Sequence, residues 1–202
     1  MKKYQTSDIN EVQKALLSGE IIAFPTDTVF GLACVFDDMT AIKKVYAAKS
    51  RESKKALPMM CGNTKMIEEV AFVSEDAKKI MKAFMPGAIT IIYKKKNVID
   101  DYVTSNLPTI GIRIPDDKWI IELIEKVGKP LLVTSANISG EPSLFKWEDV
   151  YKELDGKIDG VVMSDARGDS SSTIVDCSSE EIKVLRKGPI SIEKIMQVLK
   201  NK

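Results

Sequence analysis

The sequence predicts an α/β fold. Short runs of apolar and β-branched residues alternate along the chain with longer segments in which apolar residues recur at helical spacing. Several apolar runs lead directly into polar loops, the usual arrangement at the ends of buried strands in α/β proteins. With 202 residues, 44% of them hydrophobic, the chain is long enough for a large core. We therefore expect one domain over residues 1–202.

Helices and strands alternate in the first half of the chain. Ile9, Val12 and Leu16 share one helical face, and Gly19 is a suitable stop for that helix. The apolar run after it ends at Pro25, which cannot donate to the ladder of a central strand. A later helix begins after Ser74 and has acidic residues in its first turn, as the helix dipole favours. The expected helices are 8–17, 40–48, 64–70 and 74–84, and the expected strands are 21–24, 29–36 and 56–61.

The second half repeats this alternation. Residues 88–93 are mostly β-branched and predict a strand, and we expect the lysine triplet 94–96 on an exposed edge or loop. Gly128 ends a helix, and Ser191 is a suitable cap for the last one. The expected strands are 88–93, 109–115, 130–133, 160–163, 173–176 and 182–185, and the expected helices are 118–127, 147–154 and one after Ser191.

One predicted strand carries an arginine inside it. The alternation in residues 109–115 places Thr109, Gly111 and Arg113 on the face opposite three isoleucines. A guanidinium in such a strand requires an anionic partner, which is either a carboxylate of the protein or a carboxylate or phosphate of a ligand. The sequence alone leaves both choices open.

A cluster of cations follows the helix predicted at 40–48. Lys49, Arg51, Lys54 and Lys55 lie within seven residues, just before an apolar segment. A loop of this kind can present several cations to one anionic ligand, and a phosphate-rich ligand is the natural choice. The alternative is a group of solvated charges that the helix dipole favours at a helix C-terminus.

Two further polar stretches follow predicted strands. Residues 26–28 are small and polar, and residues 134–140 carry hydroxyl and amide groups. Both stretches lie where ligands bind in α/β sheets, although such residues are also common in turns. Neither of the common glycine-rich phosphate loops, G-x-x-x-x-G-K-[ST] and G-x-G-x-x-G, is present.

The composition excludes several kinds of site. The chain has no histidine, which removes Ser-His-Asp and Cys-His catalysis and histidine-ligated metals, so an enzyme here would act by positioning and charge stabilisation. The three cysteines are far apart and predict neither a zinc site nor a disulfide framework. A net charge of +1 gives no overall attraction to nucleic acid or anionic membranes. Without a recognisable leader or membrane span, we expect a cytoplasmic protein.

Six motifs together resemble one known family. They are PTDTVFGL at 25–32, KSR at 49–51, TIGIR at 109–113, SANISGEPS at 135–143, SSTIVD at 171–176 and VLRKGPI at 184–190. Their order and spacing are similar to those of the YrdC-type proteins, the threonylcarbamoyl-AMP synthases that supply the activated group for N6-threonylcarbamoyladenosine in tRNA. The resemblance implies a YrdC-like twisted mixed sheet flanked by helices, with a central ligand cavity. It also implies a nucleotidyltransferase that makes threonylcarbamoyl-AMP and pyrophosphate from L-threonine, bicarbonate and ATP.

The resemblance assigns a role to each matching residue. The catalytic signature consists of Lys49, Arg51, Ser135 and Asn137. Threonine is expected at Thr28, Arg113 and Ser172. The implied ATP contacts are Arg51, Lys55, Thr109, Ser135, Ser143 and Arg186. The implied cofactor is Mg²⁺, which arrives with the ATP phosphates rather than at a metal site of the protein.

The chain departs from the family pattern at three places. Met60 stands where some relatives have a histidine near the threonine, and we expect it to alter amino-acid selectivity. A serine replaces a glutamate that often precedes Ser172, and Arg51 is followed by Glu52 where many relatives have proline.

The implied partners are a threonylcarbamoyl transferase complex that modifies tRNA, and RNA itself. An RNA-binding or ribosome-maturation factor of the same fold is therefore one alternative, which the nearly neutral charge disfavours. A catalytically silent paralogue is another. The presence of both halves of the signature, Lys-x-Arg and Ser-x-Asn, argues against the paralogue.

Overall fold

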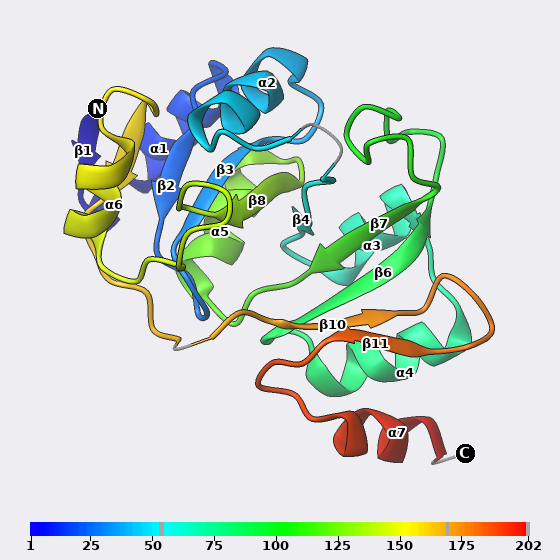
Figure 1. Ribbon diagram of the computed structural model, residues 1–202. Coiled ribbons are helices and arrows are strands. Elements are labelled where there is room, and N and C mark those ends of the chain that lie inside the picture. Colours follow the sequence, from blue (N-terminus) through cyan, green and yellow to red (C-terminus); the bar gives the residue numbers. More distant parts are fainter. Residues whose placement is uncertain (53–54, 169, 201–202) are drawn as a thin grey trace.

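The computed structural model describes residues 1–52, 55–168 and 170–200, so Lys54 of the basic cluster lies outside the described residues. Within these ranges the centre of the molecule is an eleven-stranded mixed sheet (Figure 1). Its spatial order is β1, β9, β2, β3, β8, β4, β7, β6, β10 and β11, and β5 pairs with β6. The strands are β1 (Lys2–Tyr4), β2 (Ile22–Phe24), β3 (Gly31–Val35), β4 (Met59–Met60), β5 (Ala71–Phe72), β6 (Ile89–Lys95), β7 (Thr109–Arg113), β8 (Leu131–Ser135), β9 (Gly160–Val162), β10 (Thr173–Asp176) and β11 (Lys183–Arg186).

Helices cover both faces of the sheet near β2. Alternating residues of a strand point to opposite faces, and here the residues on both faces are apolar. Ile22 and Phe24 of β2 belong to a core with helices α1 and α5, whereas Ile21 and Ala23 belong to a larger core that includes α2 and α6. The helices are α1 (Ile9–Leu17), α2 (Met39–Ala48), α3 (Thr64–Val70), α4 (Glu75–Phe84), α5 (Lys118–Val127), α6 (Trp147–Leu154) and α7 (Ile192–Lys200), with a 3-10 turn at Thr6–Asp8. Among the described residues, the helices are too short or too polar to cross a membrane.

The short strand β4 joins two parts of the sheet. Met59 pairs with Leu132 of β8 in an antiparallel ladder and with Ile112 of β7 in a parallel one. In Figure 1, strands β2, β3 and β8 lie at an angle to strands β6, β7 and β10, with β4 between them. Helix α4 packs on one face of β6. The opposite face of β6 and β7 is therefore available to line a site between the two parts.

Most predicted elements are confirmed, and the alternation predicted for residues 109–115 is correct. Ile110, Ile112 and Ile114 are buried in the larger core, whereas Thr109, Gly111 and Arg113 face the other way. Gly128 ends α5 in the left-handed conformation, at φ 73°, as its position after the helix predicted. The short strands β1 and β5 were not predicted.

The prediction of an edge or loop at 94–96 was wrong for its first two residues, which lie in β6, although the Lys94 side chain is exposed as predicted. Lys94 pairs with Phe72 of β5 on one side and with Thr109 of β7 on the other, so β6 is internal at this point. The Lys95 ammonium donates to the carbonyl of Ile99 and forms an ion pair with Asp101. Pairing to β5, a strand that the sequence did not reveal, is the reason for the difference.

Candidate active site

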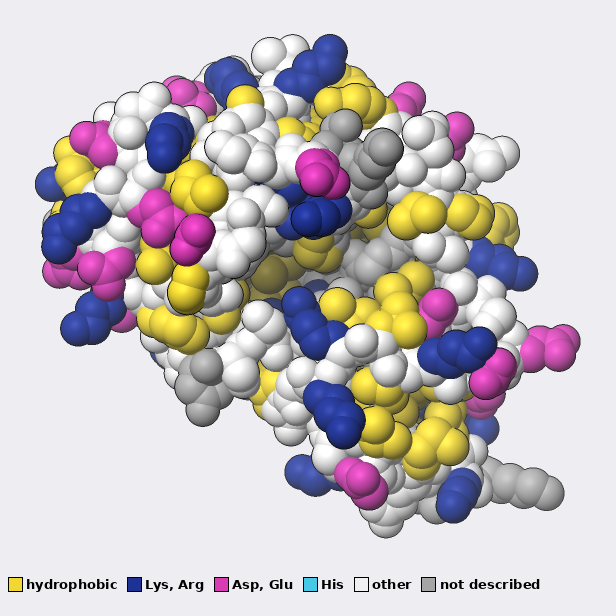
Figure 2. Space-filling model, in the orientation of Figure 1, with side chains coloured by type: hydrophobic (Ala, Val, Ile, Leu, Met, Phe, Trp, Pro, Cys, Tyr) yellow, Lys and Arg dark blue, Asp and Glu magenta, His cyan; other side chains and the backbone are white. Residues whose placement is uncertain are grey.

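A cavity of about 360 Å³ lies between the two parts of the sheet (Figure 2), on the face of β6 and β7 that α4 does not cover. This volume is within the usual range of small-molecule pockets. Strands β3, β4, β6, β7, β8, β10 and β11 all contribute to its wall. The predicted site residues that line it are Thr28, Arg51, Thr109, Arg113, Ser135, Ser172 and Arg186. The others, Lys49, Lys55, Asn137 and Ser143, lie outside this lining.

The described wall of the cavity is positively charged. Arg51, Arg113 and Arg186 line it, and no Asp or Glu is among its described lining residues. Burial lowers the pKa of all three guanidinium groups, and at Arg113 the charge and hydrogen bond of Asp27 oppose this shift. Because arginine stays protonated in proteins, the consequence is a cavity that favours an anionic ligand.

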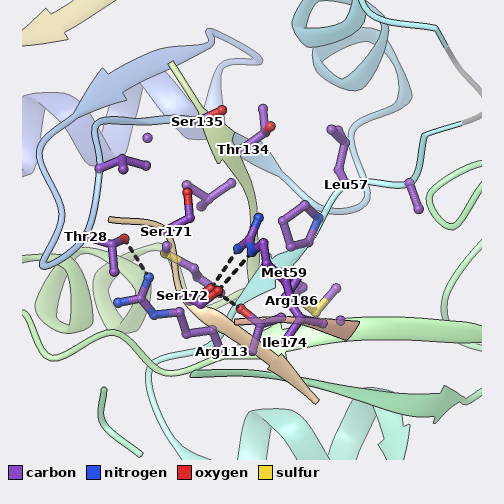
Figure 3. A pocket seen from close by; sticks show the side chains of 18 of the residues that line it. Thr28, Leu57, Met59, Arg113, Thr134, Ser135, Ser171, Ser172, Ile174 and Arg186 are labelled. Atoms are coloured by element: carbon purple, nitrogen blue, oxygen red, sulfur yellow. Dashed lines mark hydrogen bonds between the residues drawn. The ribbon is translucent and has the colours of Figure 1, made fainter. Parts of the chain in front are cut away.

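Arg113 is held at the end of β7 by contacts on all of its nitrogens. Its Nε donates to the carbonyl of Gly87 at 2.9 Å, and its Nη1 donates to Thr28 Oγ1 at 2.8 Å (Figure 3). Its Nη2 forms an ion pair with Asp27. The protein carboxylate that the sequence left open is therefore present. A guanidinium has five N–H groups, and these three bonds leave two of them without an acceptor among the described residues.

A second polar group on the cavity wall links β6 and β11 through Ser172, the residue just before β10. Ser172 Oγ lies 2.8 Å from Thr90 Oγ1 of β6 and accepts a hydrogen bond of 3.2 Å from Arg186 Nη2 of β11. Arg186 Nε donates to the carbonyl of Ser172 at 3.0 Å. Figure 3 shows Ser172 and Arg186 meeting between Arg113 and Ser135. The Arg186 side chain is long and exposed, and these bonds fix its direction.

Arg51 lies against the loop that carries Lys55. Its Nε donates to the carbonyl of Lys55 and its Nη2 to the carbonyl of Ala56, both at 3.1 Å. Lys55 itself is exposed and does not line the cavity. The side chain of Lys49 lies behind the cavity wall, whereas that of Arg51 lies on it. Ser50 between them has a left-handed backbone, with φ 49°, which turns the two side chains in different directions.

Lys49 is buried behind the cavity wall, with 1% of its surface exposed. Its ammonium donates to the carbonyls of Ser135 and Asn137, and its own carbonyl accepts from Ser139 N at 2.9 Å. Burial, together with the charge of Arg51, lowers the pKa of Lys49 to about 8, and the charge of Glu153 opposes this shift. Lys49 therefore connects the basic loop to the loop that follows β8.

Asn137 also faces the interior of its loop. Its Nδ2 donates to the carbonyls of Ile138 and Glu141, at 2.9 and 2.7 Å, while its buried Oδ1 has no hydrogen-bond partner among the described residues. Ser143 is partly buried farther along the same connection, one residue before Leu144, whose carbonyl accepts from Phe30 N at 2.9 Å. The catalytic role assigned to Asn137 and the ATP contact assigned to Ser143 stay predictions.

The lowered pKa of Lys49 predicts how the stability of the protein depends on pH. The unfolded chain holds this proton up to about pH 10.5 and the folded chain only to about pH 8. Between these values the unfolded state binds more protons, so the free energy of unfolding should rise with pH. We expect the wild type to gain about 3 kcal/mol over this range relative to Lys49→Met, measured by urea unfolding at several pH values. A pH-independent difference between the two proteins would contradict the lowered pKa.

Apart from Met60, which was expected near the threonine, sequence reasoning missed the apolar part of the wall, and it also missed one of the hydroxyl groups there. Thr90 is 6% exposed and bonds Ser172; its only signal was a hydroxyl residue within a β-branched run. Met60 lines the cavity, and it is in register with Arg113 of the neighbouring strand, so both residues lie on the same face of the sheet. The other apolar lining residues are Val29, Phe30, Ala56, Leu57, Pro58, Met59, Ile92, Leu107, Val133 and Ile174. A wall that carries both apolar and charged residues suits a ligand with both characters.

Comparison with known proteins gives several relatives. Threonylcarbamoyl-AMP synthase of Bacillus subtilis is 38% identical over 199 residues, which cover 96% of this chain and 58% of that protein. A putative threonylcarbamoyl-AMP synthase of Methanocaldococcus jannaschii is 38% identical over 185 residues, which cover 91% of this chain and 87% of that protein. The crystal structure of P. abyssi Sua5 complexed with L-threonine aligns with a TM-score of 0.90 at 29% identity, over 98% of this chain and 60% of that one.

The chain thus spans less than two thirds of the Bacillus and Pyrococcus relatives. A family model described as "Telomere recombination" and named for Sua5, YciO and YrdC matches residues 14–188. The chain belongs to the Sua5/YciO/YrdC family.

Proposed function

We propose that this chain makes threonylcarbamoyl-AMP and pyrophosphate from L-threonine, bicarbonate and ATP. One observation supports the proposal most: a single cavity is lined by three arginines, Arg51, Arg113 and Arg186. The hydroxyl groups of Thr28 and Ser172 line the same cavity, and its described lining residues include no carboxylate. L-Threonine carries a carboxylate, ATP carries a triphosphate, and bicarbonate is itself an anion. The names of the relatives support this reaction rather than another use of an anionic cavity.

The proposed chemistry needs positioning more than covalent help. The amine of threonine attacks bicarbonate and water leaves, giving an N-carboxylate. An oxygen of that carboxylate attacks the α-phosphorus of ATP, the bond to the β-phosphate oxygen breaks, and pyrophosphate leaves. Negative charge spreads over the phosphates in such transfers, so fixed cations and hydrogen-bond donors supply most of the stabilisation. Arginine, serine and threonine side chains on this wall are groups of that kind.

Arg113 and Thr28 form the proposed threonine end of the cavity. The two N–H groups that Arg113 does not use within the protein are suited to the planar carboxylate of an amino acid. Ser172, bonded to Thr90 and Arg186, supplies a further hydroxyl nearby. The thioether of Met60, which lies on the same face of the sheet as Arg113, offers no hydrogen bond of ordinary strength to the hydroxyl of threonine. We therefore expect weaker discrimination against amino acids that lack this hydroxyl.

The nucleotide is proposed to extend toward Arg51, Thr109, Ser135 and Arg186, with Lys55 and Ser143 near its outer parts. Mg²⁺ enters as part of the substrate MgATP. The chemistry of the wall fits this mode, because its described residues include no carboxylate that would hold the ion directly and its donors are suited to phosphate oxygens. Lys49 contributes through the backbone of residues 135 and 137.

The product is proposed to pass to a threonylcarbamoyl transferase that modifies tRNA in the cytoplasm. Direct binding of tRNA or double-stranded RNA is the alternative role. It predicts an affinity for RNA that falls steeply with salt, because each phosphate contact releases counterions.

Pyrophosphate release tests the proposed function. The purified chain is incubated with MgATP, bicarbonate and L-threonine, and each component is omitted in turn. We expect pyrophosphate only when all three are present. Release without threonine or bicarbonate would identify a different acceptor, and no release from any mixture would contradict the proposal.

A further inference from the structure

The loop that follows β8 is held mainly from outside the cavity. We call residues 135–141 the 135–141 loop; it includes Ser135, the last residue of β8, which pairs with Gly31 of β3 on the cavity wall, and Asn137 behind the wall. From the side of α2, Lys49 donates to the carbonyls of Ser135 and Asn137 and accepts from Ser139 N. Its position therefore depends on partners distant in sequence.

Glu153 of α6 holds the same loop from the other side. Its Oε1 accepts a hydrogen bond of 2.6 Å from Ile138 N, and its own side chain is partly buried. The charge of Glu153 also acts on the Lys49 ammonium. Helix α6 is itself firmly seated, because Val150 and Leu154 are fully buried. A carboxylate on this helix is a fixed support for the loop.

We propose that Glu153 is a positioning residue: with Lys49 it holds the 135–141 loop so that Ser135 faces the cavity in the geometry that the reaction requires. Glu153 does not line the cavity, so it acts through the loop and not on a ligand. The kinetic part of this inference rests on the proposed function, whereas the structural part does not.

Glu153 acts through a hydrogen bond and through its charge, and different substitutions can separate these two effects. Its oxygen satisfies the N–H of Ile138, and its charge is opposite to that of a buried ammonium. Gln at this position keeps an oxygen that accepts from the N–H but removes the charge, whereas Ala removes both. Loss of an acceptor at a partly buried N–H also leaves that group without its protein partner.

The test compares Glu153→Ala and Glu153→Gln with Glu148→Gln, an exposed carboxylate in the first turn of the same helix. Hydrogen–deuterium exchange of the free protein reports the loop directly. We expect exchange in residues 135–141 to become at least about tenfold faster in Glu153→Ala, with a smaller change in Glu153→Gln and none in the control. Exchange elsewhere in the protein should stay at the wild-type rate.

The kinetic readout then separates positioning from binding. Glu153→Ala should lower kcat for pyrophosphate release by roughly 10- to 100-fold with the KM for threonine within about threefold, and Glu153→Gln should recover part of kcat. Wild-type exchange in the loop of Glu153→Ala would overturn the proposal, and so would faster exchange with an unchanged kcat. If Glu153→Ala does not fold, the exchange rate of residues 135–141 and the kcat of Glu153→Gln test the proposal instead. If the wild type releases no pyrophosphate, the proposed function fails while the exchange rates still decide whether Glu153 holds the loop.

Discussion

Replacing Lys49 with methionine should abolish formation of the adenylate while the protein stays folded. The ammonium bonds two carbonyls at the start of the 135–141 loop, and methionine has a similar length but no donor. Without these bonds, the loop behind Ser135 loses two of the contacts that hold it against the cavity wall. A misplacement of about 1 Å can lower the rate about 100-fold even when the mutated residue lies away from the chemistry, and we expect a loss of at least this size.

Lys43→Met is the matched control, because Lys43 is an exposed lysine on α2, the helix that ends just before Lys49. Turnover is measured as pyrophosphate release, and folding by circular dichroism and thermal unfolding. The control should keep full activity. Near-normal turnover of a folded Lys49→Met protein would remove Lys49 from the mechanism.

Replacing Arg113 with alanine should raise the KM for threonine far more than the KM for ATP. Two N–H groups of this guanidinium are available to a carboxylate in the cavity, next to Thr28. Loss of a charge-assisted pair should cost about 2 to 4 kcal/mol, which is roughly 30- to 1,000-fold in the apparent affinity for threonine. Steady-state titration of each substrate at a saturating level of the other measures the two effects.

Asp27 requires its own control in this experiment. Removing Arg113 leaves a largely buried carboxylate without its counter-charge, which destabilises the protein independently of any ligand. The double variant Arg113→Gln with Asp27→Asn removes both charges together and should unfold at a higher temperature than Arg113→Ala. If it keeps the selective loss of threonine affinity, the loss belongs to the ligand contact. Equal losses for threonine and ATP would contradict the role assigned to Arg113.

The strands that carry the site were predictable because their patterns are local. The alternation in residues 109–115 was enough to place Thr109, Gly111 and Arg113 on one face, and that face is the cavity wall. The resemblance to a family then assigned Ser135 on β8, Arg186 on β11 and the site residues that lie outside the strands. The strand β5 escaped prediction because two residues carry too little pattern to separate a strand from a loop.

The partners of the charged residues were not predictable from the sequence. Sequence spacing does not show that Asp27 neutralises Arg113, since these residues are 86 positions apart. It also does not show that Lys49 and Arg51 point to different sides of the wall, which depends on the left-handed backbone of Ser50. Glu153 had no signal at all, because an acidic residue on an amphipathic helix reads as part of a solvated face. Such contacts are set by tertiary packing alone.

Transfer of labelled carbon from bicarbonate tests the central claim most directly. The chain is incubated with MgATP, L-threonine and ¹³C-bicarbonate, and the products are analysed by mass spectrometry. The account predicts threonylcarbamoyl-AMP with the label in its carbamoyl group and an equal amount of pyrophosphate. Its formation should be lost in Lys49→Met and retained in Lys43→Met. Pyrophosphate without a labelled adenylate would contradict the account.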